Sequence, residues 1–218
     1  MSSTQDIKEK YRRHAKRYDF AIQLYRLIGL RIESYRLRAV ELLCLKRGDS
    51  VVDLGCGTGL NFDLIVKQIG PKGRLIGVDL SPEMLACALE RSERAGFNNL
   101  ELVQADIADY DIPVGVNGVL STGAFGYVTE YDRVIEKVSQ ALNQGGRLVI
   151  LDGKLPERWP LWLFRLFVWL SRPFGVTTEY FSHPCWESVG RFFQEVELEE
   201  RYGGLIYISS GTAASTPA

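Results

Sequence analysis

The chain has 218 residues, of which 46% are hydrophobic, and a formal net charge of -1. This length is sufficient for one domain with a sizeable core. The near-neutral charge argues against a nucleic-acid partner, because phosphate binding usually requires a clear excess of Lys and Arg. The charge is uneven, however, since residues 1–47 hold twelve Lys or Arg against five Asp or Glu. This basic N-terminal segment is either a solvated helical face or a surface attracted to anionic membranes.

Helices are predicted at the start of the chain. From about Thr4 to Leu45 the apolar residues recur at helical spacing, as in Phe20 and Leu24. The segment contains no apolar run of the kind found in signal sequences, and the four cysteines are scattered, without metal-ligand spacing. We therefore expect reduced thiols, no metal site and a cytoplasmic protein, whose association with membranes stays open.

From residue 50 onward, short strands alternate with helices. The predicted strands are 50–54, 74–80, 100–106, 116–122 and 147–152, and the predicted helices lie near 59–69, 82–95 and 130–143. Strands rich in Val, Ile and Leu, joined by helices, indicate a parallel sheet covered on both faces. Two later strand-like runs, joined through Gly203-Gly204, predict an antiparallel hairpin. The expected fold is a doubly wound, Rossmann-like α/β domain with a mostly parallel seven-stranded sheet and N-terminal cap helices.

The strongest local signal is the segment 53–59, Asp-Leu-Gly-Cys-Gly-Thr-Gly, where a buried strand leads into a glycine-rich turn and then a helix. Glycines allow turn conformations that other residues avoid, and they let a ligand approach the main chain closely. Asp53, two residues before the first glycine, would repel a diphosphate. It suits a ligand that ends in an ammonium group, such as S-adenosylmethionine, which also carries a sulfonium cation.

Two further carboxylates follow the next two predicted strands. Asp79 lies 24 residues after Gly55, where this architecture places an acceptor for ribose hydroxyls. Ser81 and Pro82 then begin a helix, as N-cap and first helical residue. Asp106 could accept a hydrogen bond from an adenine amino group. All three acids are expected at the carboxyl ends of successive strands, where open α/β sheets bind ligands.

With these motifs, the sequence resembles the class I S-adenosylmethionine-dependent methyltransferases, from about Tyr11 to Leu151 and most strongly at 53–59 and 77–84. The looser pattern from Tyr11 to Tyr18 is similar to the start of quinone-biosynthesis methyltransferases and phospholipid N-methyltransferases, where the first helices close over the cofactor. The fourth strand opens with Val116-Asn117, whereas the family often has Phe-Asp there. The resemblance implies S-adenosylmethionine as cofactor and S-adenosylhomocysteine as product.

The resemblance also implies a role for each matching residue. Asp53 and the glycines would surround the methionine moiety, Asp79 would bind the ribose, and Met84 would pack on adenine. Ser121 and Thr122 would open the loop that faces the sulfonium. The full set of predicted cofactor-binding residues is Tyr11, Tyr18, Asp53, Gly55, Cys56, Gly57, Gly59, Asp79, Leu80, Met84, Asp106, Ile107, Ser121 and Thr122.

Methyl transfer from a sulfonium is an in-line displacement that mainly needs alignment of the two reactants and exclusion of water. An amine acceptor must also lose a proton, which calls for a base. The predicted catalytic residues are Tyr18, Tyr127 and His183, with His14 and Asp152 as further candidates. The expected parts of the domain are cap helices (1–47), a cofactor-binding core (48–152), a lid or acceptor insertion (153–194) and a closing hairpin (195–210).

The segment 156–174 holds three of the four Trp residues and is too short and too interrupted to span a bilayer. It predicts either a well-buried lid helix or a helix that lies in a membrane interface, and both favour an apolar acceptor. The predicted function is methyl transfer to a lipophilic small molecule or lipid head group, such as a phospholipid amine or a quinone-like ring. A nicotinamide-dependent oxidoreductase is disfavoured by the G-x-G-x-G turn and Asp53. A non-catalytic module that binds S-adenosylmethionine stays as the third alternative.

Overall fold

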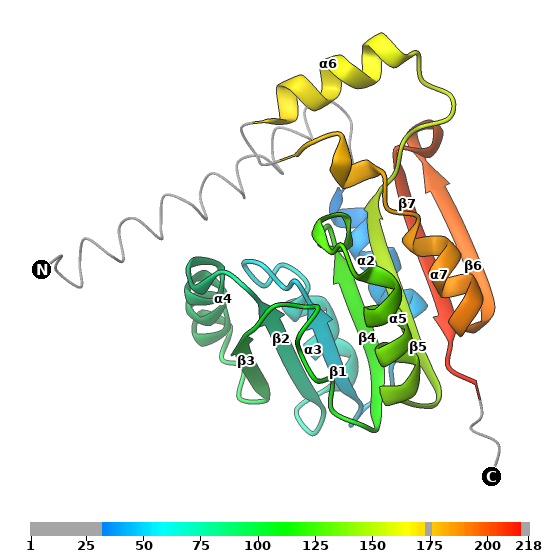
Figure 1. The fold of residues 1–218 in the computed structure, drawn as a ribbon. Helices are drawn as coiled ribbons and strands as arrows, with labels where there is room; N and C mark the ends of the chain where they lie inside the picture. The colour runs from blue at the N-terminus through cyan, green and yellow to red at the C-terminus, as the bar shows by residue number, and fades with distance from the viewer. Residues whose placement is uncertain (1–31, 173–175, 215–218) are drawn as a thin grey trace, which may run out of the picture.

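The computed structural model of the chain describes residues 32–172 and 176–214 (Figure 1). Tyr11, His14 and Tyr18 lie outside the described residues, as do any helices that precede Ile32. The strands are β1 (Ser50–Leu54), β2 (Arg74–Asp79), β3 (Leu100–Gln104), β4 (Val116–Thr122), β5 (Leu142–Gly153), β6 (Gln194–Arg201) and β7 (Ile206–Thr212). The helices are α2 (Ile32–Leu42), α3 (Phe62–Ile69), α4 (Pro82–Ala95), α5 (Tyr131–Ala141), α6 (Leu161–Ser171) and α7 (Cys185–Phe192).

The described strands form one seven-stranded sheet in the order β3-β2-β1-β4-β5-β7-β6. Strands β1 to β5 are parallel, and β7 pairs antiparallel with both β5 and β6. This confirms the predicted mostly parallel α/β sheet with an antiparallel hairpin. Because β1 pairs with β2 on one side and β4 on the other, the strand order reverses at β1, and such a point is where open α/β sheets bind ligands.

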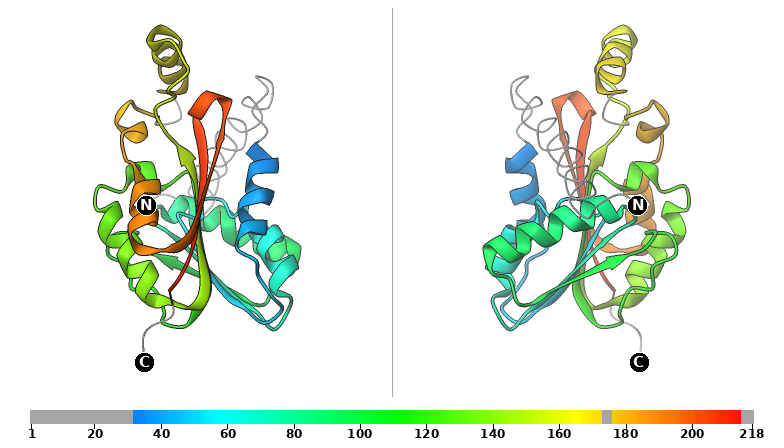
Figure 2. Two further views of the ribbon diagram at one scale, coloured as in Figure 1. Left: turned by 90° about the vertical axis from the view of Figure 1, so that its right-hand side faces the viewer. Right: turned by 90° about the vertical axis from the view of Figure 1, so that its left-hand side faces the viewer.

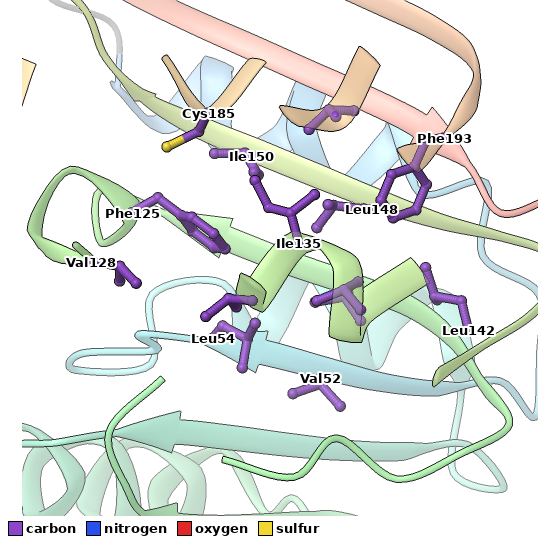
Figure 3. Close-up of a cluster of buried hydrophobic side chains, with 14 of the residues drawn as sticks. Val52, Leu54, Phe125, Val128, Ile135, Leu142, Leu148, Ile150, Cys185 and Phe193 are labelled. Atoms are coloured by element: carbon purple, nitrogen blue, oxygen red, sulfur yellow. The ribbon is translucent and has the colours of Figure 1, made fainter. Parts of the chain in front are cut away.

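Helices cover both faces of the sheet (Figure 2). One core lies under α2, α3 and α4, and the other lies under α5 and α7. In the second core, Ile135 of α5 lies beside Ile150 and Leu148 of β5, as Figure 3 shows. Burying each such side chain contributes roughly 1.5–3 kcal/mol, so the two cores hold the parallel strands in fixed register.

Two helix boundaries differ from the predicted ones. Helix α3 begins at Phe62 instead of residue 59, because Gly59 has a φ of +77° and cannot be helical. Helix α5 ends at Ala141 instead of residue 143, because Leu142 adopts extended backbone and pairs with Val116. Strand β5 therefore begins five residues earlier than predicted, with a register shift opposite Val116–Gly118.

Helix α6 follows the carboxyl end of β5 and stands clear of the sheet at that end (Figure 1). Its Phe164 and Val168 are buried against Phe181 and Leu205, but the opposite side of the helix is exposed. Of the two alternatives predicted for this segment, the well-buried lid helix is therefore wrong, because the helix packs on one side only and its other apolar residues are exposed. Within residues 32–172 and 176–214, no helix has the length and apolar character needed to cross a membrane.

Candidate functional site

The glycine-rich turn after β1 is tied to the neighbouring strand. The backbone N–H groups of Gly55 and Cys56 both donate to the carbonyl of Val78, at 2.8 and 2.9 Å. Gly55, Gly57 and Gly59 have φ of +69°, +55° and +77°, a region that favours glycine. The turn therefore depends on its glycines, as the sequence predicts.

Two of these glycines differ in their surroundings. A Cβ at Gly55 would lie 2.3 Å from the Cβ of Ala124 and 3.3 Å from Cδ1 of Ile107. A Cβ at Gly57 would meet no described atom within 4 Å. Gly55 therefore allows close packing within the protein, whereas Gly57 leaves its main chain open to approach from outside.

Asp79, at the end of β2, holds the turn and the next helix together. One carboxylate oxygen accepts from the backbone N–H of Gly57 at 2.8 Å, and the other accepts from that of Ser81 at 2.9 Å. The Ser81 hydroxyl then accepts from the N–H of Met84 at 3.2 Å, which caps α4. Each oxygen of Asp79 keeps acceptor capacity beyond its one hydrogen bond. Leu80, which follows Asp79, is 63% exposed.

Asp53 is fully buried beneath the turn. Because Val52 and Leu54 point into the core under α5, Asp53 points to the opposite face, toward α2 and α3. The side-chain amide of Asn61 donates to both of its oxygens, at 3.1 and 3.0 Å. Burial raises the pKa of the Asp53 carboxyl to about 7, and the Asn61 hydrogen bonds and the Arg36 charge offset only part of this effect.

Arg36, from α2, completes this buried network and is a residue that the sequence analysis missed. Its Nη1 donates to the side-chain Oδ1 of Asn61 and to the hydroxyl oxygen of Thr122, both at 2.8 Å. The residue is only 8% exposed, and its Nε has no hydrogen-bond partner within the described part of the chain. No spacing rule connects Arg36 with Asp53, and the basic character of residues 1–47 suggested a surface position.

The end of β3 contributes Asp106 and Ile107. Asp106 is exposed, and its carboxylate accepts from the N–H of Ala108 at 2.9 Å, which turns the chain after the strand. Ile107 faces the glycine turn at Gly55. Asp79 and Asp106 thus lie at the carboxyl ends of neighbouring strands, with Asp53 one residue before the end of β1.

The end of β4 joins the turn to the segment after β5. The Ser121 hydroxyl donates to the carbonyl of Leu54 at 2.8 Å, so β1 and β4 are linked where both strands end. Thr122 belongs to the network of Asp53. The chain then enters the short 3-10 helix η1 (Phe125–Tyr127), in which Tyr127 is 55% exposed. The ring centroid of Tyr127 lies 4.8 Å from that of Tyr180, in a second 3-10 helix, η3 (Glu179–Phe181).

Asp152 and Tyr180 form a buried pair beside η1. The Tyr180 hydroxyl and the N–H groups of Gly126 and Gly153 all donate to the Asp152 carboxylate. Burial raises the pKa of Asp152 to about 6, and these hydrogen bonds oppose the rise. Burial and the charge of Asp152 raise the pKa of Tyr180 well above its usual value. The Tyr180 hydroxyl therefore keeps its proton, and its hydrogen bond to Asp152 links η3 to η1, whose Gly126 donates to the same carboxylate.

His183 lies just after η3, and its ring is next to that of Tyr131, with centroids 5.4 Å apart. Its Nδ1 is 3.0 Å from the carbonyl oxygen of Gly126. A carbonyl can only accept, so Nδ1 carries the proton, and in the neutral ring Nε2 bears the lone pair. Of the three predicted catalytic residues, Tyr127 and His183 thus lie around η1, and Tyr18 is outside the described residues.

The chain matches the model of a methyltransferase domain family over residues 45–168, which is more than half of its length. It is similar to an arsenite methyltransferase of Halobacterium salinarum, with 35% identity over 108 residues, 48% of this chain and 27% of that protein. It is also similar to a demethylmenaquinone methyltransferase of Thermus thermophilus, with 32% identity over 147 residues, 66% of this chain and 64% of that protein. Each match spans less than two thirds of the relative.

A solved structure shares the fold. The phosphoethanolamine N-methyltransferase 2 of Haemonchus contortus, in complex with S-adenosyl-L-methionine, has a TM-score of 0.68 at 15% identity, over 84% of this chain and 53% of that chain. The family match and the glycine-rich turn with its neighbouring carboxylates both indicate a methyltransferase. The chain belongs to the class I S-adenosylmethionine-dependent methyltransferases, and its cofactor is S-adenosylmethionine.

The residues present fit this cofactor. The open side of Gly57 leaves room for a ligand against the main chain, next to the carboxylate of Asp79. The unpartnered Nε of Arg36 is a donor that suits a carboxylate, and the buried Asp53 provides a negative charge near the same place. The methionine moiety of the cofactor carries a carboxylate that complements Arg36, and an ammonium group and a sulfonium that complement the negative charge of Asp53.

Proposed function

We propose that the protein transfers a methyl group from S-adenosylmethionine to a lipophilic small molecule or a lipid head group. The observation that carries the proposal is the aromatic character of the segment beside the donor site. Tyr127, in η1 after β4, packs against Tyr180 of η3, and the apolar helix α6 follows the end of β5. An acceptor that approaches the sulfonium from this side would meet aromatic rings more than charges.

On the donor side, we assign the ribose to Asp79 and the methionine moiety to the turn at Gly55–Gly59 and to Asp53. Adenine would lie between Met84 and the residues after β3, Asp106 and Ile107. Support comes from their joint position at the carboxyl ends of β1, β2 and β3. The other predicted contacts of this set are Tyr11, Tyr18, Cys56, Leu80, Ser121 and Thr122.

For an acceptor that must lose a proton, His183 is the proposed base. Support comes from its tautomer, because the carbonyl of Gly126 holds the proton on Nδ1 and leaves Nε2 as the accepting atom. Tyr127 and Tyr18 are the alternatives. Bound S-adenosylmethionine supplies an activated methyl group, so the residues of the protein need only align the acceptor and exclude water.

Two of the three relatives described above support acceptors found in lipophilic molecules, whereas the name of the Halobacterium salinarum relative points to arsenite. The name of the Thermus thermophilus relative points to a quinone-like ring, and that of the Haemonchus contortus structure points to an amine. Both kinds of group occur in lipophilic molecules. We therefore also propose peripheral contact with a membrane, through residues 156–174 and the basic N-terminal segment.

The donor half of the proposal is tested by calorimetric titration of the full chain with S-adenosylmethionine, S-adenosylhomocysteine and NADH. Asp79→Ala should abolish binding of both adenosyl ligands, whereas Asp111→Ala, at an exposed acid paired with Lys137, should leave it unchanged. Binding of NADH alone would identify an oxidoreductase and refute the proposal.

The acceptor half is tested with S-adenosylmethionine carrying a radioactive methyl group. Separate reactions contain a demethylated quinol, phosphatidylethanolamine vesicles or arsenite, and the label is counted in the organic and aqueous phases. Label in a quinone or phospholipid supports the proposal. Label only in arsenite would refute the lipophilic acceptor, and binding of the cofactor without turnover of any acceptor would indicate a binding module.

A further inference from the structure

Helix α6 is apolar on two sides, and the described residues bury only one of them. Phe164 and Val168 are buried in the small core with Phe181 and Leu205. Away from that core, the helix carries five large apolar side chains that are between 44% and 67% exposed: Leu161, Trp162, Leu166, Trp169 and Leu170. A surface helix usually presents polar residues there, and a contiguous exposed apolar patch marks an interaction site.

Positive charge accompanies this exposed side. Arg158, Arg165 and Arg172 follow one another at intervals of seven residues, all three are exposed, and no Asp or Glu occurs between the first and the last of them. Trp162 and Trp169 repeat with the same interval. Within the helix, seven residues correspond to about two turns, so Arg165 and Arg172 share one side of α6.

This combination matches one class of partner. Tryptophan prefers the boundary between lipid head groups and acyl chains, and Arg binds lipid phosphates through its planar group of donors. A protein partner with an apolar groove would explain the tryptophans but would not require the row of arginines. A helix of 11 residues is about 16 Å long, which suits a position along a membrane surface.

The position of α6 brings this surface to the same end of the molecule as the donor site. The helix follows the carboxyl end of β5, and the cofactor turn follows the carboxyl end of the parallel strand β1. Figures 1 and 2 show α6 extending beyond that end of the sheet. A membrane against α6 would therefore lie on the side from which an acceptor reaches the donor.

We propose that the exposed side of α6 docks onto an anionic membrane surface. Trp162, Leu166 and Trp169 enter the boundary between head groups and acyl chains, and the three arginines contact lipid phosphates. The purpose of this docking rests on the proposed lipophilic acceptor, but its test does not depend on methyl transfer.

The test is co-sedimentation of the full chain with vesicles of phosphatidylcholine, with and without phosphatidylglycerol. We expect binding to the anionic vesicles that weakens as salt is raised. The double variant Trp162→Ala/Trp169→Ala should reduce binding by at least about ten-fold, and Arg165→Gln/Arg172→Gln should remove the dependence on phosphatidylglycerol. Val114→Ala, which changes an exposed apolar residue away from α6, should bind like the wild type.

Titration with S-adenosylmethionine verifies that each variant is folded. The proposal is overturned if the wild-type chain does not sediment with anionic vesicles, or if the tryptophan variant binds as well as the wild type. It is also overturned if the wild type is a dimer in solution that the tryptophan changes dissociate, because a second copy then covers α6. Methylation of a detergent-solubilised acceptor without vesicle binding would reject this inference alone, whereas tryptophan-dependent vesicle binding without methylation would reject the proposed function alone.

Discussion

Replacing Asp53 with Asn should stabilise the protein and weaken its hold on the cofactor. Burial raises the pKa of this carboxyl to about 7 from an ordinary 3.8. Below pH 3.8 the group is neutral in both the folded and the unfolded chain. As the pH rises toward 7, the unfolded chain releases the proton first, so the folded state loses stability, by about 4 kcal/mol once the pH exceeds 7. An amide at this position carries no such cost.

Urea unfolding of the ligand-free protein tests this expectation. At pH 8 the free energy of unfolding of Asp53→Asn should exceed that of the wild type by up to about 4 kcal/mol, and at pH 5 by about 2 kcal/mol. Other titrating groups cancel, because both proteins contain them. Asp63→Asn, an exposed position on α3, should show no such dependence on pH. An equal difference at both pH values, or a variant less stable than the wild type at pH 8, would refute the reasoning.

The same carboxyl should make cofactor binding depend on pH. A bound cation favours the charged form of Asp53, so the affinity of the wild type for S-adenosylmethionine should rise up to about pH 7 and then level off. In Asp53→Asn we expect weaker affinity without this rise, measured by calorimetric titration at several pH values. Binding of the cationic cofactor would explain why the chain has a carboxylate at position 53 although its burial lowers the stability of the folded state.

Other changes have equally definite consequences. Asp79→Asn should lower the affinity for S-adenosylhomocysteine by at least about ten-fold, measured by titration, with an unchanged circular dichroism spectrum. Gly55→Ala combines a φ of +69° with a Cβ 2.3 Å from that of Ala124, and it should cost about 2 kcal/mol or more in chemical unfolding. His183→Gln can still donate to the Gly126 carbonyl, so kcat with an amine acceptor should fall about 100-fold while cofactor affinity holds; unchanged kcat would exclude this base. Tyr180→Phe removes a donor to the charged form of Asp152, so it should destabilise by about 1–2 kcal/mol at pH 8 and by less at pH 5.

The sheet was predictable because its signals are local. Pairs such as Val51-Val52 place apolar side chains on both faces of a strand, as helices on both sides of the sheet require, and β1 and β4 have the predicted bounds. The errors lie where one residue decides a boundary. Gly59 delays α3, and Leu142 leaves α5 to pair with Val116, a contact that no periodicity reveals.

The only part of the candidate site that could be predicted was the part whose residues are close both in sequence and in space. Asp53, Asp79 and the glycines belong to strand ends and the turn that joins them to the next element, so their spacing carries information. Arg36 comes from a helix before the sheet, and its charge suggested solvent rather than burial. For α6 the sequence left a buried helix and an interfacial helix as alternatives, because an apolar helix in a sequence does not reveal how much of it the fold covers.

The network around Asp53 links the cofactor site to the packing of α2. Arg36 from α2 holds Asn61, which holds Asp53, and the same guanidinium holds Thr122 at the end of β4. A ligand that favours the charged form of Asp53 therefore also favours the arrangement in which Arg36 is inserted. Because such coupling is reciprocal, a well-packed α2 strengthens cofactor binding as much as the cofactor strengthens α2. If Asp53 binds the cofactor as proposed, helix α2 contributes to that site through Arg36 as well as covering the sheet.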